Sequence, residues 1–250
     1  MTEIVVTQAY CGPPTTGNGG YVGGLLAKGL DGAATVVLRK AIPLDTRLTL
    51  VADGQTSELL DPEGVSLGNG RLAAADIFPA VPAPPSLDAA RQAGDRFVGL
   101  TQPFHPICFT CSPNREPGSG LRICVGQLEG EADGEMAGVW TPHANFTDPD
   151  GLIPTEVIWG ALDCPGFYAW VGREGRHGAL LGTMTGEVLR RPKAGEACII
   201  RAWPLDRDGR KATAGVALFT AQGELLARAF QVWIQMNWAP AQAALEATES

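Results

Sequence analysis

One acidic residue of the sequence lies where a charge is costly. Asp163 directly follows the apolar run Val157–Leu162 and directly precedes Cys164 and Pro165. A carboxylate among apolar residues costs free energy unless it is paired or serves a function. Such a group could take a proton from water and act as a general base. The structural alternative is a helix cap, since acids beside a proline often cap a helix that begins there.

Cysteines form a second group that could do chemistry. Cys108 and Cys111 have the spacing of half a zinc site, with Cys124 or His105 as further candidate ligands. A second cysteine pair is missing, so the number of ligands favours no metal. Cys164 could be a nucleophile, but the sequence places no histidine to activate it, which favours a buried structural thiol.

The segment that begins at Asn18 is rich in glycine and has helical character. Asn18 is a typical N-cap residue, and its amide could also hold a carbonyl group. The first N–H groups of a helix lack partners within it, so those of Gly19 and Gly20 suit a carbonyl oxygen. Gly23 and Gly24 have a structural explanation, because a helix buried against a curved sheet needs close backbone approach.

Residues 15–78 and 161–236 repeat one order of features. Each copy opens with a glycine-bearing helical segment, from Asn18 in the first copy and from Asp163 in the second. Each then enters a strand with a basic pair and a proline at its end, Val37–Pro43 and Val188–Pro192, and closes through alternating strands. A repeat this long exceeds a solenoid unit and indicates a duplicated small domain.

The pattern of apolar residues and turn formers gives further elements. Pro79–Pro85 should be a linker, and Asp148–Gly151 a turn. Helices are expected over 87–94 and 155–171, the second kinked or interrupted at Pro165, and strands over 121–126, 136–140, 180–189, 197–204, 213–221 and 225–236. The predicted domains are an N-terminal unit (1–84), a linker with the Cys-x-x-Cys segment (85–120), a C-terminal unit (121–240) and a tail (241–250).

Composition narrows the functional classes. The 250 residues, 45% hydrophobic, suffice for one large core or two fused small ones. A net charge of −8 leaves no basic stripe for nucleic acid. No apolar run is long enough to span a membrane, and the N-terminus lacks the features of a signal peptide. Scattered cysteines indicate reduced thiols, so a cytoplasmic location is expected.

Four segments together resemble the hotdog fold in its double form, as found in acyl-CoA thioesterases and their relatives. They are Gly17–Gly20, Leu189–Gly195, the closing hairpin from Asp208 to Ala227, and Cys108–Cys111 with Gly120–Ile123. The resemblance covers almost the whole chain. It implies an α+β fold in which two tandem units, each a helix wrapped by an antiparallel sheet, form one continuous sheet. It also implies an acyl thioester between the two helices, with CoA only as part of the substrate and no other cofactor.

The resemblance carries over few catalytic residues. Where some single-unit relatives have a histidine before two glycines, this chain has Asn18, and the position of their acid falls near Ala27. Of the Asp, Thr and Gln set of the long-chain type, only Gln231 matches, since the Asp position falls at Thr183–Thr185. Thr183 and Thr185 alternate on a strand expected to face the helix and could position water, although threonine also simply suits strands.

The sequence therefore predicts a hydrolase for an acyl-CoA or acyl-carrier thioester. Asp163, Asn18, Gln231 and Thr183 are the candidate catalytic residues. Substrate contacts are expected from Gly19, Gly20, Gly166 and Thr185, and no metal ligand is assigned. The alternatives are an apolar-ligand or thioester binder without activity and an enoyl-thioester hydratase or dehydratase. Neither a nucleic-acid nor a membrane partner is expected, and pairing with further copies of the chain stays open.

Overall fold

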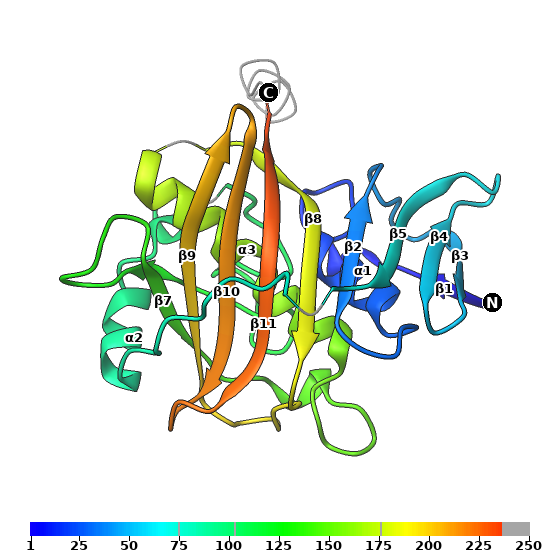
Figure 1. Ribbon diagram of the computed structural model, residues 1–250. Helices are drawn as coiled ribbons and strands as arrows, with labels where there is room; N and C mark the ends of the chain where they lie inside the picture. The colour runs from blue at the N-terminus through cyan, green and yellow to red at the C-terminus, as the bar shows by residue number, and fades with distance from the viewer. Residues whose placement is uncertain (75, 103, 176, 237–250) are drawn as a thin grey trace, which may run out of the picture.

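The structure is a computed structural model that describes residues 1–74, 76–102, 104–175 and 177–236 (Figure 1). In these residues eleven strands form one antiparallel sheet in the order β1-β3-β4-β5-β2-β8-β11-β10-β9-β7-β6. The strands are β1 (Thr2–Val5), β2 (Ala34–Leu38), β3 (Arg47–Ala52), β4 (Thr56–Leu60), β5 (Ser66–Leu72), β6 (Gly126–Gln127), β7 (Met136–Trp140), β8 (Ala179–Val188), β9 (Cys198–Asp208), β10 (Lys211–Thr220) and β11 (Leu225–Gln235). The helices are α1 (Gly19–Ala27), α2 (Leu87–Gly94) and α3 (Thr155–Glu174), with short 3-10 turns at Gln8–Tyr10, Val98–Leu100 and Ala144–Phe146.

The two halves of the sheet have the same topology. They meet at β2 and β8, where Ala34 pairs with Gly186 and Val37 with Thr183. Outward from this junction the order is β2, β5, β4, β3, β1 on one side and β8, β11, β10, β9, β7 on the other, where the short β6 is added at the edge. In each half the strand that follows the long helix lies at the junction, and the next three strands return towards it. The predicted duplication is therefore confirmed at the level of topology.

The helices α1 and α3 lie against each other on one face of the sheet (Figure 1). A Cβ atom on Gly20 would lie 2.5 Å from the carbonyl oxygen of Trp159, and one on Gly24 would lie 2.3 Å from the Cα of Glu156. The glycines of α1 were expected to allow close approach to the sheet. Gly20 and Gly24 instead allow close approach to α3, because the two helix backbones cross in direct contact.

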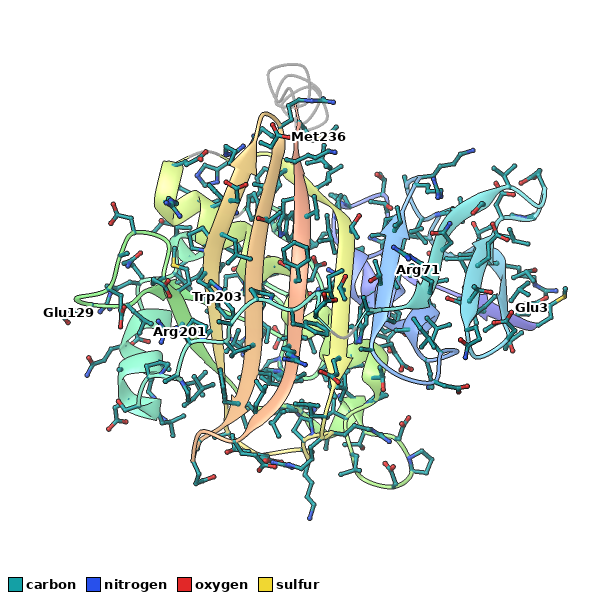
Figure 2. All side chains as sticks on the ribbon, viewed as in Figure 1. Glu3, Arg71, Glu129, Arg201, Trp203 and Met236 are labelled. Carbon is teal, nitrogen blue, oxygen red and sulfur yellow. The ribbon has the colours of Figure 1, made fainter. Side chains whose placement is uncertain are left out.

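The opposite face of the sheet is covered at the β7 and β9 end. The α2 residues Ala90 and Ala93 belong to a second core cluster with Trp203 and Phe219. The proline-rich segment that precedes α2 crosses this face, and Arg201 of β9 donates a hydrogen bond to the Ala83 carbonyl there (Figures 1 and 2). This segment was predicted as a linker, and the described part of it contains no helix or strand.

Most predicted elements are confirmed, with boundary shifts of a few residues. The strand expected over 121–126 is wrong, because only Gly126 joins a ladder. Its N–H groups bond elsewhere: Leu121 donates to the carbonyl of Phe109 and Ile123 to that of Thr110. The Asp148–Gly151 turn is confirmed by the bond from the Gly151 N–H to the Asp148 carbonyl. The predicted tail, 241–250, lies outside the described residues, and the domain boundaries remain predictions.

The interruption expected at Pro165 is also wrong, because α3 continues from Thr155 to Glu174. Proline removes one N–H and crowds the preceding turn. At that turn Gln231 of β11 donates its amide to the carbonyl oxygens of Leu162 (2.7 Å) and Asp163 (3.1 Å). A side chain from the sheet thus supplies hydrogen bonds to the turn that the proline disturbs.

Asp163 consequently lies in the interior of α3. The alternative that it caps a helix beginning at Pro165 is wrong, and so is the expectation that the second helix opens there. Among the described residues, none of the helices combines the length and apolar character needed to cross a membrane.

Candidate functional site

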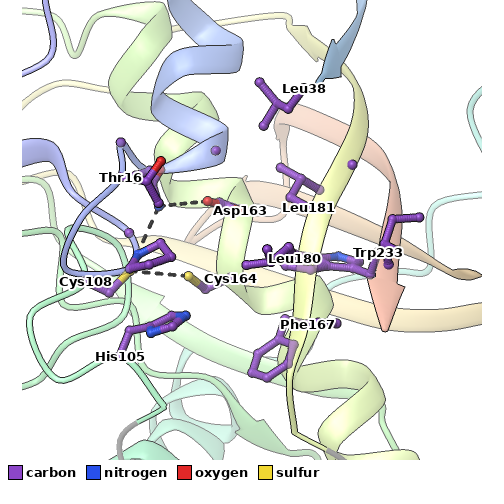
Figure 3. Close-up of a pocket in the computed structure, with 18 of the residues that line it drawn as sticks. Thr16, Leu38, His105, Cys108, Asp163, Cys164, Phe167, Leu180, Leu181 and Trp233 are labelled. Atoms are coloured by element: carbon purple, nitrogen blue, oxygen red, sulfur yellow. Dashed lines mark hydrogen bonds between the residues drawn. The ribbon is translucent and has the colours of Figure 1, made fainter. Parts of the chain in front are cut away.

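Asp163 meets the N-terminus of α1 across the contact between the two helices. Its Oδ2 accepts hydrogen bonds from the Asn18 side-chain amide (2.7 Å) and from the Gly20 N–H (3.0 Å), as Figure 3 shows in part. Asn18 is also the N-cap of α1, since its Oδ1 accepts from the Tyr21 N–H at 2.9 Å. Cap and site therefore coexist in one asparagine, and the structure brings together three of the predicted site residues.

The Asp163 carboxyl group is buried and only half used. Asp163 is only 4% exposed, and its Oδ1 has no hydrogen-bond partner among the described residues. The pKa of Asp163 is raised to about 7, mainly by burial and in smaller part by the nearby Cys108, although the hydrogen bonds from the Gly20 N–H and the Asn18 amide lower it. A carboxyl group with one oxygen anchored and the other open is suited to accept a proton from a bound molecule.

A cavity of about 340 Å³ opens beside this carboxyl group. Asn18, Gly19 and Asp163 line it, together with segments from the start of β8 and the end of β11. Its apolar wall is formed by Leu38, Ile42, Phe167, Leu181, Trp233 and Ile234 (Figure 3). An apolar cavity with a few convergent polar groups is typical of a small-molecule site, and its size is at the lower end of such pockets.

Gly19 and Gly20 have different positions in the site. The Gly20 N–H is bonded to Asp163, so it is not free for a substrate carbonyl in this structure, and its predicted substrate contact stays a prediction. Gly19 lines the cavity, and no hydrogen bond of its N–H is found within the described ranges. Only the first N–H group of α1 thus remains for an incoming oxygen.

Gln231 holds α3 instead of lining the cavity. It is completely buried, its amide nitrogen donates to two α3 carbonyls, and its Oε1 accepts from the Trp233 indole N–H at 2.9 Å. Gly166 allows this approach, since a Cβ there would lie 1.8 Å from Gln231 Oε1. Both residues therefore position the Asp163 segment, and neither is among the residues that line the cavity.

Replacing Gln231 with leucine should destabilise the fold by about 2 kcal/mol, because the Trp233 N–H and two α3 carbonyls lose their partner in a buried place. Chemical denaturation would measure the change. Gln222→Leu, at an exposed turn, is the matched control and should leave the free energy of unfolding nearly unchanged. Equal stability of Gln231→Leu and the wild type would show that the amide does not hold α3.

Thr183 and Thr185 lie on the wrong face of the sheet for the predicted role. Met184 and Gly186 face the helices, since a Cβ on Gly186 would lie 2.6 Å from the Trp159 ring. Alternation along β8 therefore turns both threonines to the other face, where Thr185 Oγ1 lies 2.9 Å from Thr35 Oγ1. Neither threonine lines the cavity. The contact between Thr185 and Thr35 joins β8 to β2, where the two halves of the sheet meet.

Three cysteines gather at the cavity wall. Cys108, Cys111 and Cys164 have their sulfur atoms within 4.8 Å of one another, and the Cys108 and Cys164 sulfurs lie 3.7 Å apart (Figure 3). The sequence suggested Cys124 as a partner of the Cys-x-x-Cys pair, and the structure brings Cys164 instead. Hydrogen bonds from the Cys111 and Cys164 thiols lower the pKa of Cys108 well below its ordinary value.

His105 is a cavity residue that sequence reasoning connected only with a metal. It lines the same cavity as Asp163, and burial lowers its pKa. Its spacing before Cys108 was the only signal in the sequence. The aromatic residues Phe167 and Tyr168 line the cavity and also belong to the core, which further contains Trp140, Trp159 and Trp170.

Solved structures with the same arrangement cover nearly the whole chain. A protein from Novosphingobium aromaticivorans designated a thioesterase superposes with a TM-score of 0.61 at 15% identity, over 94% of this chain and 95% of that one. An acyl-CoA thioesterase II from Mycobacterium marinum gives a TM-score of 0.55 at 13% identity, over 94% and 92%. The chain has the double-hotdog fold.

A third solved structure, from Thermobifida fusca and designated a thioesterase II, gives a TM-score of 0.58 at 15% identity over 93% and 91% of the two chains. No protein-family model and no curated protein sequence matches the chain. The fold expected from the sequence is thus confirmed, with two tandem units and one continuous sheet.

Proposed function

We propose that this double hotdog hydrolyses an acyl thioester of CoA or of an acyl carrier in the cavity between α1 and α3. One observation carries the proposal: Asp163 has Oδ2 anchored by Asn18 and Gly20, while Oδ1 has no partner in the part of the chain that the structure describes and the residue lines an apolar cavity. The thioesterase names of similarly folded proteins support the same reaction class.

The reaction follows from the positions of these groups. The acyl chain would lie along Leu38, Phe167 and Leu181, with the thioester carbonyl near the N-terminus of α1. Asp163 Oδ1 takes a proton from a water molecule as its oxygen attacks the carbonyl carbon. The Gly19 N–H stabilises the oxyanion. The carbon–sulfur bond then breaks, and the proton on Asp163 passes to the departing thiolate.

Release of free thiol from a panel of acyl-CoA esters tests the proposal. The purified chain should release thiol from at least one ester well above the rate in buffer, since a general base alone contributes about 10²-fold or more. Tight binding of every ester without thiol release would contradict hydrolysis and favour a binder without activity.

Enoyl-thioester hydration is a second candidate because His105 lines the same cavity as Asp163. An acid and a base on one wall could add water across a double bond. Loss of the enoyl-thioester absorbance of crotonyl-CoA without release of thiol would favour hydration, and release of thiol in proportion to that loss would favour hydrolysis.

The apolar wall should select for acyl length. Leu181→Trp adds a large ring beside Gly19. The two residues are already close, since a Cβ atom on Gly19 would lie only 3.2 Å from the Leu181 side chain. We expect kcat/KM for the preferred ester to fall at least about 10-fold, with shorter acyl groups affected less, because pocket volume discriminates by about 1–3 kcal/mol per methylene. Leu189→Trp, at an exposed position after β8, is the matched control and should change no preference. The wall assignment is wrong if both variants behave alike.

A further inference from the structure

The three clustered thiols come from separate parts of the chain. Cys108 and Cys111 belong to the segment between α2 and β6, and Cys164 lies in the interior of α3. All three line the cavity, and their sulfur atoms form a triangle with every pair within 4.8 Å. They are free thiols, as are the other three cysteines. Such a convergence is not required by packing alone, because a core can be filled by hydrocarbon.

The spacing fits a tetrahedral soft-metal site. Zinc binds cysteine sulfur at about 2.3 Å, so two sulfurs of one tetrahedral site lie about 3.8 Å apart. The Cys108 and Cys164 sulfurs are 3.7 Å apart without a bond between them. A hydrogen bond between these two thiols would not by itself bring a third sulfur into the same triangle.

We propose that Cys108, Cys111 and Cys164 bind one zinc ion as thiolates, with the fourth coordination position on the cavity side. The inference is independent of the proposed hydrolysis, since it depends only on the three sulfur atoms. Three protein ligands with one position left open are typical of zinc that contacts a bound molecule, and four protein ligands are typical of structural zinc.

The surroundings of the three thiols suit a bound divalent cation. In the described part of the chain, no lysine or arginine donates to any of the three sulfurs. The Tyr168 hydroxyl lies 3.7 Å from the Cys111 sulfur and the Asn18 amide 4.0 Å from the Cys108 sulfur, so both can donate weakly to thiolates. Donors of this kind orient metal ligands and tune their charge. A dication would offset the thiolate charges that the protein leaves uncompensated.

Bound zinc would also fasten the Cys-x-x-Cys segment to α3. Ile107 and Cys11 already connect this segment to the N-terminal unit, because the Cys11 thiol donates to the Ile107 carbonyl at 3.3 Å. Metal binding to a site absent from the unfolded chain stabilises the folded state. Zinc would therefore hold together the cavity wall and the helix that carries Asp163.

Metal analysis of the full chain tests the site. The wild type, produced with added zinc and dialysed, should retain about one zinc per chain. Cys164→Ser and Cys111→Ser should each retain less than about a tenth of this, because a lost thiolate removes one of three ligands. Cys198→Ser is the matched control, a buried cysteine outside the cluster, and should retain zinc as the wild type does.

A second measurement needs no variant. The wild type loaded with Co²⁺ should show the intense visible bands of tetrahedral cobalt and a thiolate-to-cobalt charge-transfer band in the near ultraviolet. Absence of zinc and of these bands would overturn the proposal, as would equal zinc in Cys164→Ser and the wild type. A disulfide between two of the three cysteines in freshly purified protein would overturn it too. Neither zinc content nor the cobalt spectrum depends on thioester hydrolysis, so failure of the zinc site and failure of the proposed reaction are separate results.

Discussion

Asp163→Asn is expected to lower the turnover of the preferred acyl-CoA by about 100-fold or more, since general-base catalysis contributes about 10²–10⁴-fold. The asparagine retains the size of the side chain. Its Oδ1 can still accept from Asn18 and Gly20, which contact Asp163 at 2.7 and 3.0 Å in the wild type. What it loses is the ability to take a proton from water. Steady-state kinetics of thiol release measures the change.

Glu156→Gln is the matched control for this variant. Glu156 is a largely buried carboxylate of the same helix, paired with Lys28 at 3.1 Å, and it does not line the cavity. Its loss should leave turnover within about 2-fold of the wild type, because an ion pair with one partner largely exposed contributes little. Unchanged turnover in Asp163→Asn would remove Asp163 from the reaction.

Gly24→Ala should destabilise the fold by about 3 kcal/mol, the upper end of the about 1–3 kcal/mol that forced overpacking typically costs. The added methyl group would lie 2.3 Å from the Glu156 Cα and 2.9 Å from the Trp159 Cβ, so α1 and α3 must separate. In an exposed helix the same change would stabilise by about 1 kcal/mol. The sign of the effect therefore reports on the helix contact.

Denaturant unfolding of Gly24→Ala and Gly32→Ala makes the comparison. A Cβ on Gly32 would lie 3.8 Å from its nearest neighbour, an ordinary contact, so this control should unfold within about 1 kcal/mol of the wild type. If Gly24→Ala were as stable as the wild type, the helices could not cross as closely as described.

The duplicated topology was predictable because local signals repeat in both halves. The strand end with its basic residues and the later hairpin strands recur in order, and β7 to β11 lie close to their expected ranges. The irregular structure of residues 121–125 was not predictable, because their apolar side chains suit a strand in a sheet and a packed loop equally well. Their N–H groups instead donate to the carbonyls of Phe109 and Thr110, which belong to the Cys-x-x-Cys segment and to no strand.

The position of Asp163 in its helix could not be obtained from local propensity. Pro165 favours a break, and Gln231 from a strand that follows much later supplies hydrogen bonds to the same turn. The sequence predicted only that Asn18 and Asp163 occupy roughly equivalent positions in the two copies, and it did not predict the contact between them. The actual contact depends on glycines at 20 and 24, which let α1 cross α3.

The faces of β8 were assigned wrongly although its sequence alternates. Polar residues at 183, 185 and 187 alternate with Met184, Gly186 and Val188, which is the pattern of a strand with one inward face. Thr183 and Thr185 lie opposite to the expected side, because Met184 and Gly186 take the face towards the helices. The third thiol of the cluster was missed for a different reason, since Cys164 reaches Cys108 only through the tertiary fold.

A crystal structure with a non-hydrolysable acyl-CoA analogue tests the central claim most directly. The account predicts the acyl chain along Phe167 and Leu181 and the carbonyl oxygen about 3 Å from the Gly19 nitrogen. A water molecule should lie between that carbonyl and Asp163 Oδ1. An analogue bound elsewhere on the chain, with this cavity closed by its own side chains, would contradict the account.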